Sequence, residues 1–157
     1  MYMVYQTAMT GVVATLAMTA LLYFIHGRGL ANADMIRAVG SLITHSEENA
    51  FTPGVVIHGI SGVVFAFVYI AIWSLLPVAS FQHYWLLGLF TGAAHGLVVS
   101  FMLVATVAEK HPLERFRRAG LGVAVAHLAA HVVYGLVIGL LAGLIQIRFA
   151  AFSGLLM

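Results

Sequence analysis

The stretch from residue 119 to residue 147 reads AGLGVAVAHLAAHVVYGLVIGLLAGLIQI and decides the fold of this chain. It contains no Asp, Glu, Lys or Arg. At about 1.5 Å of rise per residue, a helix of this length crosses the roughly 30 Å hydrocarbon core of a bilayer. It nevertheless holds two histidines, His127 and His131. A polar ring at that depth is costly, so it usually has a partner or a function.

Three further stretches of the chain have the same character. They carry no charged side chain, and two of them hold one histidine each, His58 and His95. The composition is 62% hydrophobic and 8% charged, whereas about a quarter of the residues in soluble domains are charged. The 157 residues therefore predict one all-α domain, a transmembrane four-helix bundle. The predicted spans are about 7–25, 54–76, 84–108 and 119–147.

The composition and motifs also exclude several functions. Without cysteine, the chain has no disulfide and no thiolate-bound metal or iron–sulfur centre. A nucleic-acid site needs a basic groove with aromatic stacking, which this sequence lacks, so we predict no nucleic-acid partner. We find no nucleophile elbow, phosphate-binding loop, dinucleotide fingerprint or His-Glu-x-x-His motif. This favours a non-catalytic subunit over an enzyme.

The distribution of Lys and Arg predicts the orientation in the membrane. The connections after the first and third spans are basic, whereas the connection at 77–83 has no Lys or Arg. The positive-inside rule places the basic connections in the cytoplasm and both termini outside, in what we expect to be the bacterial inner membrane. The basic residues of the two connections are Arg28, Arg37, Lys110, Arg115, Arg117 and Arg118.

The first basic connection contains an amphipathic segment. Asn32 is a residue type that caps helices, and apolar residues follow it at helical spacing. We predict a short helix over 33–43 that lies on the membrane surface. The alternative is a loop whose apolar residues pack beneath the bundle. These residues are Met35, Ile36, Val39, Leu42 and Ile43.

The sequence also indicates two similar hairpins. A Thr-Gly pair recurs in the first and third spans, and a His-x-x-x-Gly pattern recurs in the second and fourth. Because both basic connections would face the same side, these matches predict a parallel internal repeat. The matched residues are Thr10-Gly11 with Thr91-Gly92, and His58 and Gly62 with His131 and Gly135.

Glycines recur at four-residue spacing in the third and fourth spans. Within lipid, helices associate through close packing and interhelical hydrogen bonds, because apolar side chains gain little by leaving one apolar medium for another. The glycines predict such packing, within the chain or between copies of it. The alternative is that the missing side chains leave room for a flat ligand. The glycines are Gly88, Gly92, Gly96, Gly135, Gly139 and Gly143.

The four histidines within the predicted spans fall at two depths. His95 and His131 lie near the middle of their spans, and a short connection makes these spans antiparallel neighbours. We therefore expect His95 and His131 to face each other. His58 and His127 lie nearer the cytoplasmic side and would form a second pair.

Several interpretations of these histidines stay open. In the first, each imidazole only hydrogen-bonds another helix, contributing roughly 0.6–2 kcal/mol. In the second, His95 and His131 are the axial ligands of haem b, with His58 and His127 as further candidates. In the third, His95, His127 and His131 bind Cu or Zn. Proton or quinone handling, which uses a pKa near 6.5, is a further alternative.

Two segments carry a resemblance. Residues 10–19, TGVVATLAMT, and 131–140, HVVYGLVIGL, resemble segments of uncharacterised small four-helix bacterial membrane proteins, which implies the fold but no activity. Together with the histidines, this leads us to expect an accessory or cofactor-holding subunit of a membrane redox complex. Such a subunit would contact lipid and pack against other membrane subunits or copies of itself. The alternatives are a purely structural or assembly subunit, and a small oligomeric channel or transporter.

Overall fold

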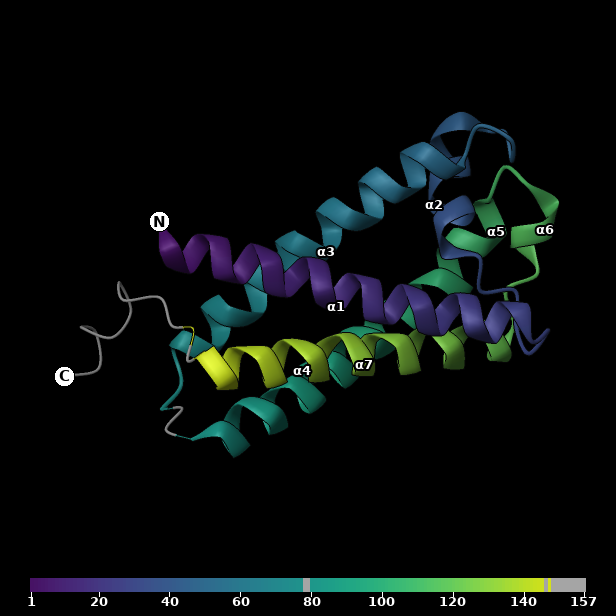
Figure 1. Cartoon of the computed structure of the whole chain (residues 1–157). Helices are drawn as coiled ribbons and strands as arrows, with labels where there is room; N and C mark the ends of the chain where they lie inside the picture. Colours follow the sequence, from purple (N-terminus) through teal and green to yellow (C-terminus); the bar gives the residue numbers. More distant parts are fainter. Residues whose placement is uncertain (78–79, 146, 148–157) are drawn as a thin grey trace.

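The computed structural model describes residues 1–77, 80–145 and 147, and these residues contain helices and no strand (Figure 1). Within this part of the chain, four helices are long and apolar enough to span a membrane: Tyr2–Gly27, Phe51–Ser74, Phe81–Lys110 and Leu121–Ile145. The four long apolar helices expected from the sequence are thus confirmed, with bounds shifted by a few residues. The elements are α1 (Tyr2–Gly27), α2 (Met35–Thr44), α3 (Phe51–Ser74), α4 (Phe81–Met102), the π-helical turn η1 (Leu103–Val107), α5 (Ala108–Lys110), α6 (Glu114–Arg117) and α7 (Leu121–Ile145).

The four long helices pack side by side in the order α3, α1, α7 and α4. The tightest pair is α4 with α7, and α1 lies against both α7 and α3 (Figure 1). The short helix α2 packs on α3. In Figure 1, α2, α5 and α6 gather at the end of the bundle that lies opposite the N-terminus. The two basic connections therefore meet at one end of the molecule.

Glycines form the seam between α4 and α7. A Cβ atom added to Gly88 would overlap the carbonyl oxygen of Gly135, and one added to Gly135 would overlap that of Gly88. A Cβ on Gly92 would lie 2.6 Å from the carbonyl oxygen of His131. The opposing backbone thus fills the space that the missing side chains leave.

A second close approach joins α1 to α3. A Cβ on Gly11 would lie 2.8 Å from the Cβ of Ala66 and 3.2 Å from the carbonyl oxygen of Gly62. A Cβ on Gly62 would overlap the hydroxyl of Thr15. Small residues therefore set the distance between the helices of this pair as well.

The start of α2 differs from the prediction. The helix begins at Met35, and the carboxylate of Asp34 caps it by accepting from the backbone N–H of Arg37 at 3.3 Å. The expected cap, Asn32, is wrong, because its amide donates instead to the carbonyl of Arg115 at 2.8 Å. The helix itself, predicted over 33–43, is present over 35–44.

An ionic network joins the two basic connections. Asp34 is only 3% exposed and accepts from the guanidinium of Arg115 in α6 at 3.0 Å. It also pairs with Arg37 at 3.4 Å. The same Arg115 pairs with Glu47, which lies between α2 and α3. Two arginines thus compensate the one buried carboxylate at this end.

Large apolar side chains cover the outside of α3 and α4. Phe90 is 66% exposed and Phe101 is 72% exposed on α4, and Ile60 is 59% exposed on α3. Soluble monomers rarely show contiguous apolar surface on this scale. The outer surface of the bundle is therefore suited to lipid or to an apolar partner.

The glycine seam predicts a position-specific effect of a single methyl group. We expect Gly135→Ala to lower the stability by about 1–3 kcal/mol, because the new methyl must push α7 away from Gly88. The matched control is Gly59→Ala on α3, where an added Cβ meets no atom within 4 Å. The measurement is the thermal denaturation midpoint in detergent, followed by circular dichroism. Equal denaturation midpoints for the two variants would contradict the close backbone contact of α4 and α7 at Gly135.

The buried carboxylate predicts a second contrast. We expect Asp34→Asn to destabilise the protein by about 1–3 kcal/mol, because Arg37 loses its carboxylate partner and Arg115 keeps only Glu47, although asparagine can still cap α2. Glu114→Gln is the control, since Glu114 and its partner Arg118 are 75% and 83% exposed. An exposed pair of this kind contributes about 0–1 kcal/mol. Chemical denaturation at low and high salt compares the two variants, and similar losses would refute the network.

Candidate functional site

His95 and His131 meet where α4 packs on α7. Their ring centroids lie 4.7 Å apart, and the planes are inclined by 71°, so that the rings meet edge to face. His95 and His131 therefore face each other, as expected from the sequence. The glycines around them allow this contact, since Gly96 lies against the Cβ of His131.

Backbone carbonyls fix the tautomers of His127 and His131. The Nδ1 of His131 lies 2.7 Å from the carbonyl oxygen of His127, and the Nδ1 of His127 lies 2.8 Å from that of Val123. A carbonyl oxygen only accepts, so both Nδ1 atoms carry the hydrogen. Each neutral ring therefore presents the lone pair of its Nε2.

A tyrosine holds His95. Its Nδ1 lies 3.1 Å from the hydroxyl of Tyr69, which also lies 3.2 Å from the carbonyl oxygen of Thr91. When Tyr69 donates to that carbonyl, His95 donates to Tyr69 and its Nε2 keeps the lone pair. The ring of Phe65 packs on His95 with centroids 4.2 Å apart. Two side chains of α3 thus orient the imidazole of α4.

A threonine on α1 holds His58. The Nε2 of His58 lies 3.0 Å from the hydroxyl of Thr19, which donates to the carbonyl of Thr15 at 2.7 Å. Because the hydroxyl has a single hydrogen, His58 is the donor and its Nδ1 keeps the lone pair. His58 and His127 share no hydrogen bond, since His58 bonds Thr19 and the Nε2 of His127 has no hydrogen-bond partner, and their expected pairing stays a prediction.

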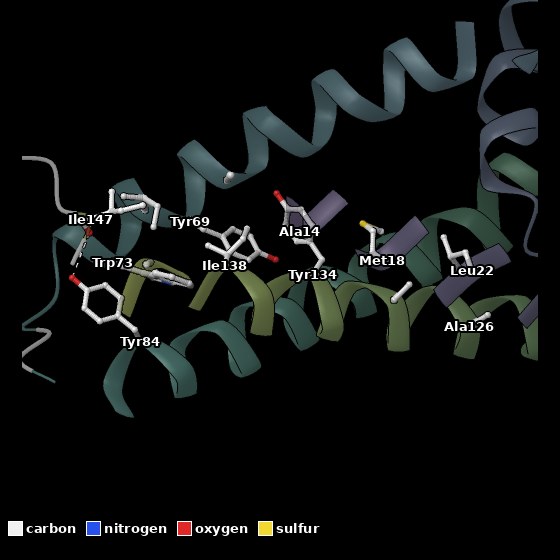
Figure 2. Close-up of a cluster of buried hydrophobic side chains, with 14 of the residues drawn as sticks. Ala14, Met18, Leu22, Tyr69, Trp73, Tyr84, Ala126, Tyr134, Ile138 and Ile147 are labelled. Carbon is white, nitrogen blue, oxygen red and sulfur yellow. Dashed lines mark hydrogen bonds between the residues drawn. The ribbon is translucent and has the colours of Figure 1, made fainter. Parts of the chain in front are cut away.

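Three of the four histidines of the predicted spans line one partly open pocket, which we call the central cavity. It has a volume of about 160 Å³, and His58, His95 and His131 lie on its wall. Met18 and Met35 line it too. Figure 2 shows Met18 on α1 and Tyr134 on α7 among the buried side chains nearby. His127 lies instead on the wall of a second cavity.

The described histidine, aspartate and glutamate side chains include no group of three placed to hold one metal ion. His127 is absent from the wall of the central cavity. The three-histidine metal site of His95, His127 and His131 therefore stays a prediction that requires side chains to move. The pair that the structure brings together is His95 with His131.

The dimensions of the cavity favour a small ligand. In a haem with two axial histidines, metal–nitrogen bonds of about 2 Å on both sides of the iron place the ring centroids about 6 Å apart. The rings of His95 and His131 are closer than this, at 4.7 Å. Pockets for drug-sized ligands span about 300–1,000 Å³, and the central cavity is smaller. Haem binding here stays a prediction and requires α4 and α7 to separate.

Sequence reasoning singled out the histidines but missed Tyr69, Phe65 and the methionines of the cavity. Tyr69 follows His58 by about three helical turns and so shares its face of α3, which is a signal that was available. Met18 and Met35 belong to separate elements, α1 and α2. Only the tertiary packing brings them to one wall.

The fold and the site define an all-helical protein with four helices suited to a membrane and a histidine-lined interior. Residues 1–150 match a family of unknown function, DUF6789, and the chain belongs to this family. No curated protein and no solved structure matches the chain. The family membership groups the chain with its relatives and assigns it no activity.

The carbonyl contacts predict the protonation site of two rings. We expect His127 and His131 to carry the hydrogen on Nδ1 at about pH 8, above the usual histidine pKa of about 6.5. Nitrogen NMR of ¹⁵N-histidine-labelled protein in detergent micelles measures this, because the two ring nitrogens differ in shift when only one is protonated. Variants His127→Asn and His131→Asn assign the signals. A hydrogen on Nε2 of His131 would contradict the geometry.

Proposed function

We propose that the chain is a cofactor-holding subunit of a membrane redox complex, and that His95 and His131 bind a copper ion at the central cavity. The observation that carries the proposal is the contact of the two rings, together with the Nδ1–H of His131 that donates to the carbonyl of His127 and leaves the Nε2 lone pair free. Histidines that bind metals almost always donate their other ring N–H to a carbonyl or carboxylate in this way.

The chemistry of the cavity wall favours Cu(I) over Zn²⁺ and over haem b. Imidazole suits both ions, but the thioethers of Met18 and Met35 are soft ligands that select Cu(I). No carboxylate lines the central cavity, and a single positive charge costs less to transfer there than two. A bare ion also suits a cavity of about 160 Å³ better than a porphyrin does.

The proposal includes a placement in the membrane. The chain lies in the bacterial inner membrane with the basic connections in the cytoplasm and the termini outside. The meeting of both connections through Arg115, Asp34 and Glu47 supports a common side for them. The exposed Phe90 and Phe101 of α4 supply an apolar surface for lipid, another subunit or a second copy.

We also propose that the bundle is a parallel repeat of two hairpins. In the first hairpin Gly11 lies near Gly62, and in the second Gly92 lies against Gly135. These are the positions matched in the sequence. His58 and His131 then occupy equivalent positions, four residues before those second glycines.

A second candidate function is that of a structural or assembly subunit. It is favoured by the observation that each of the four imidazoles already has one nitrogen within hydrogen-bonding distance of its own chain. In this case the histidines hold helices together, and their replacement lowers stability without affecting any ligand.

Copper titration of the purified full chain separates the two candidates. Under reducing conditions, with a chromophoric Cu(I) chelator as competitor, we expect about one equivalent of copper to bind. Removing one ligand should weaken binding by about tenfold or more, equal to about 1.4 kcal/mol. The variants are His131→Asn and Met18→Leu, the second of which conserves volume. His83→Asn is the control, because His83 is exposed at the start of α4.

Four further outcomes are informative. Tighter binding of Zn²⁺ than of Cu(I) would refute the choice of ion, and a Soret band in protein purified from membranes would favour haem b. Normal folding of both variants with unchanged copper affinity would refute the site. Substoichiometric copper in the unmodified chain, with lower thermal midpoints for His95→Leu and His131→Leu, would favour the structural role.

A further inference from the structure

A second cavity, which we call the loop-side cavity, lies beside the central cavity. It has a volume of about 240 Å³ and is bounded by residues of α2, η1 and α7. The two cavities share Met35, Val39 and Val99 as lining residues. A cavity of about 150 Å³ holds a benzene molecule, so the loop-side cavity has room for a ring with a short alkyl chain.

Most of the wall of the loop-side cavity is hydrocarbon. Apolar side chains of α2, α4, η1 and the start of α7 supply it. An apolar ligand that enters such a space gains roughly 25 cal/mol for each Å² of apolar surface removed from water. Examples are Leu42 of α2, Leu103 and Val107 of η1, and Val123 of α7.

The polar groups on this wall already have partners, with one exception. Asp34 pairs with Arg37 and Arg115. The Nδ1 of His111 accepts from the backbone N–H of Leu113 at 3.1 Å, and its Nε2 donates to the carbonyl of Ala38 at 3.0 Å. The remaining contacts are Asn32 with the carbonyl of Arg115, and Arg118 with Glu114.

The exception is His127. Its side chain is 2% exposed, it lines the loop-side cavity, and its Nε2 has no hydrogen-bond partner. Because Nδ1 donates to the carbonyl of Val123, the neutral ring presents Nε2 as an acceptor. A buried acceptor left without a donor costs about 1–3 kcal/mol. His127 thus places an acceptor in need of a donor beside this cavity, and a ligand must displace the atoms that shield Nε2 in order to reach it.

A second feature of this wall is independent of His127. The chain passes from α4 into the π-helical turn η1, Leu103–Val107, and both of these residues line the cavity. Single π-helical turns within α-helices are rare and occur frequently at functional sites. The irregular turn therefore lies at the same cavity as the unpartnered nitrogen.

We propose that the loop-side cavity binds a small lipid-soluble alcohol or phenol. The hydroxyl of this ligand donates to the Nε2 of His127, and its hydrocarbon part packs against α2 and η1. The ligand is neutral, because the ionic groups on the wall already have charged partners: Asp34 pairs with Arg37 and Arg115, and Arg118 pairs with Glu114. Quinol head groups belong to this chemical class. The proposal concerns a different cavity and a different histidine from the copper site.

The test compares a phenol with its methyl ether. 4-Butylphenol and 4-butylanisole have similar shapes, but only the phenol donates a hydrogen bond. Binding to the full chain in detergent micelles is measured by equilibrium dialysis, and micelles without protein give the partition background. We expect the protein to bind the phenol about tenfold or more tightly than the ether.

Two variants locate the site. His127→Leu should abolish the preference for the phenol, and Leu103→Trp should fill the cavity and weaken both ligands. His83→Leu is the control and should retain the full preference, since His83 is exposed. The phenol–ether comparison needs only the unmodified chain, so it remains decisive even when a variant fails to fold.

Equal binding of the phenol and the ether, or no binding of either above the micelle background, would overturn the proposal. So would a full phenol preference in folded His127→Leu protein. These results leave the copper titration untouched, because that experiment uses Met18 and His131 of the central cavity. The two proposals therefore fail separately.

Discussion

The backbone contact between α4 and α7 is the constraint on which the rest of this structure depends. Gly88 and Gly135 bring the two helices so close that an added Cβ on either would overlap the other backbone. In lipid, apolar side chains supply little force to hold helices together, so this close packing has to do so. It also places His95 and His131 with ring centroids 4.7 Å apart. The seam and the site are thus consequences of the same missing side chains.

Much of this arrangement was predictable from the sequence. The absence of charged residues over each span gave the four long helices, and residue counting gave the shared depth of His95 and His131. The cap of α2 was not predictable, because Asn32 and Asp34 are both good capping residues. The choice of Asp34 depends on Arg115, which lies far along the chain and pairs with its carboxylate at 3.0 Å. Local propensity carries no information about such a partner.

The division of the histidines between two cavities was also beyond sequence reasoning. His127 and His131 are one helical turn apart and share a face of α7. His131 nevertheless lines the central cavity, whereas His127 lines the loop-side cavity. Met35 and Val39 of α2 belong to the walls of both. The position of α2, a helix that lies outside the four spans, is part of what separates the two spaces.

The position of α2 therefore links the charged end of the molecule to its interior. Asp34 caps α2 and binds Arg115 of α6, so the ionic network fixes where this helix begins. The residue that follows, Met35, already lines both cavities. A change at the ionic network would move the shared wall and alter both spaces together. The first basic connection is thus a structural part of the histidine-lined interior, and its short amphipathic helix has a role in the bundle besides any contact with the membrane surface.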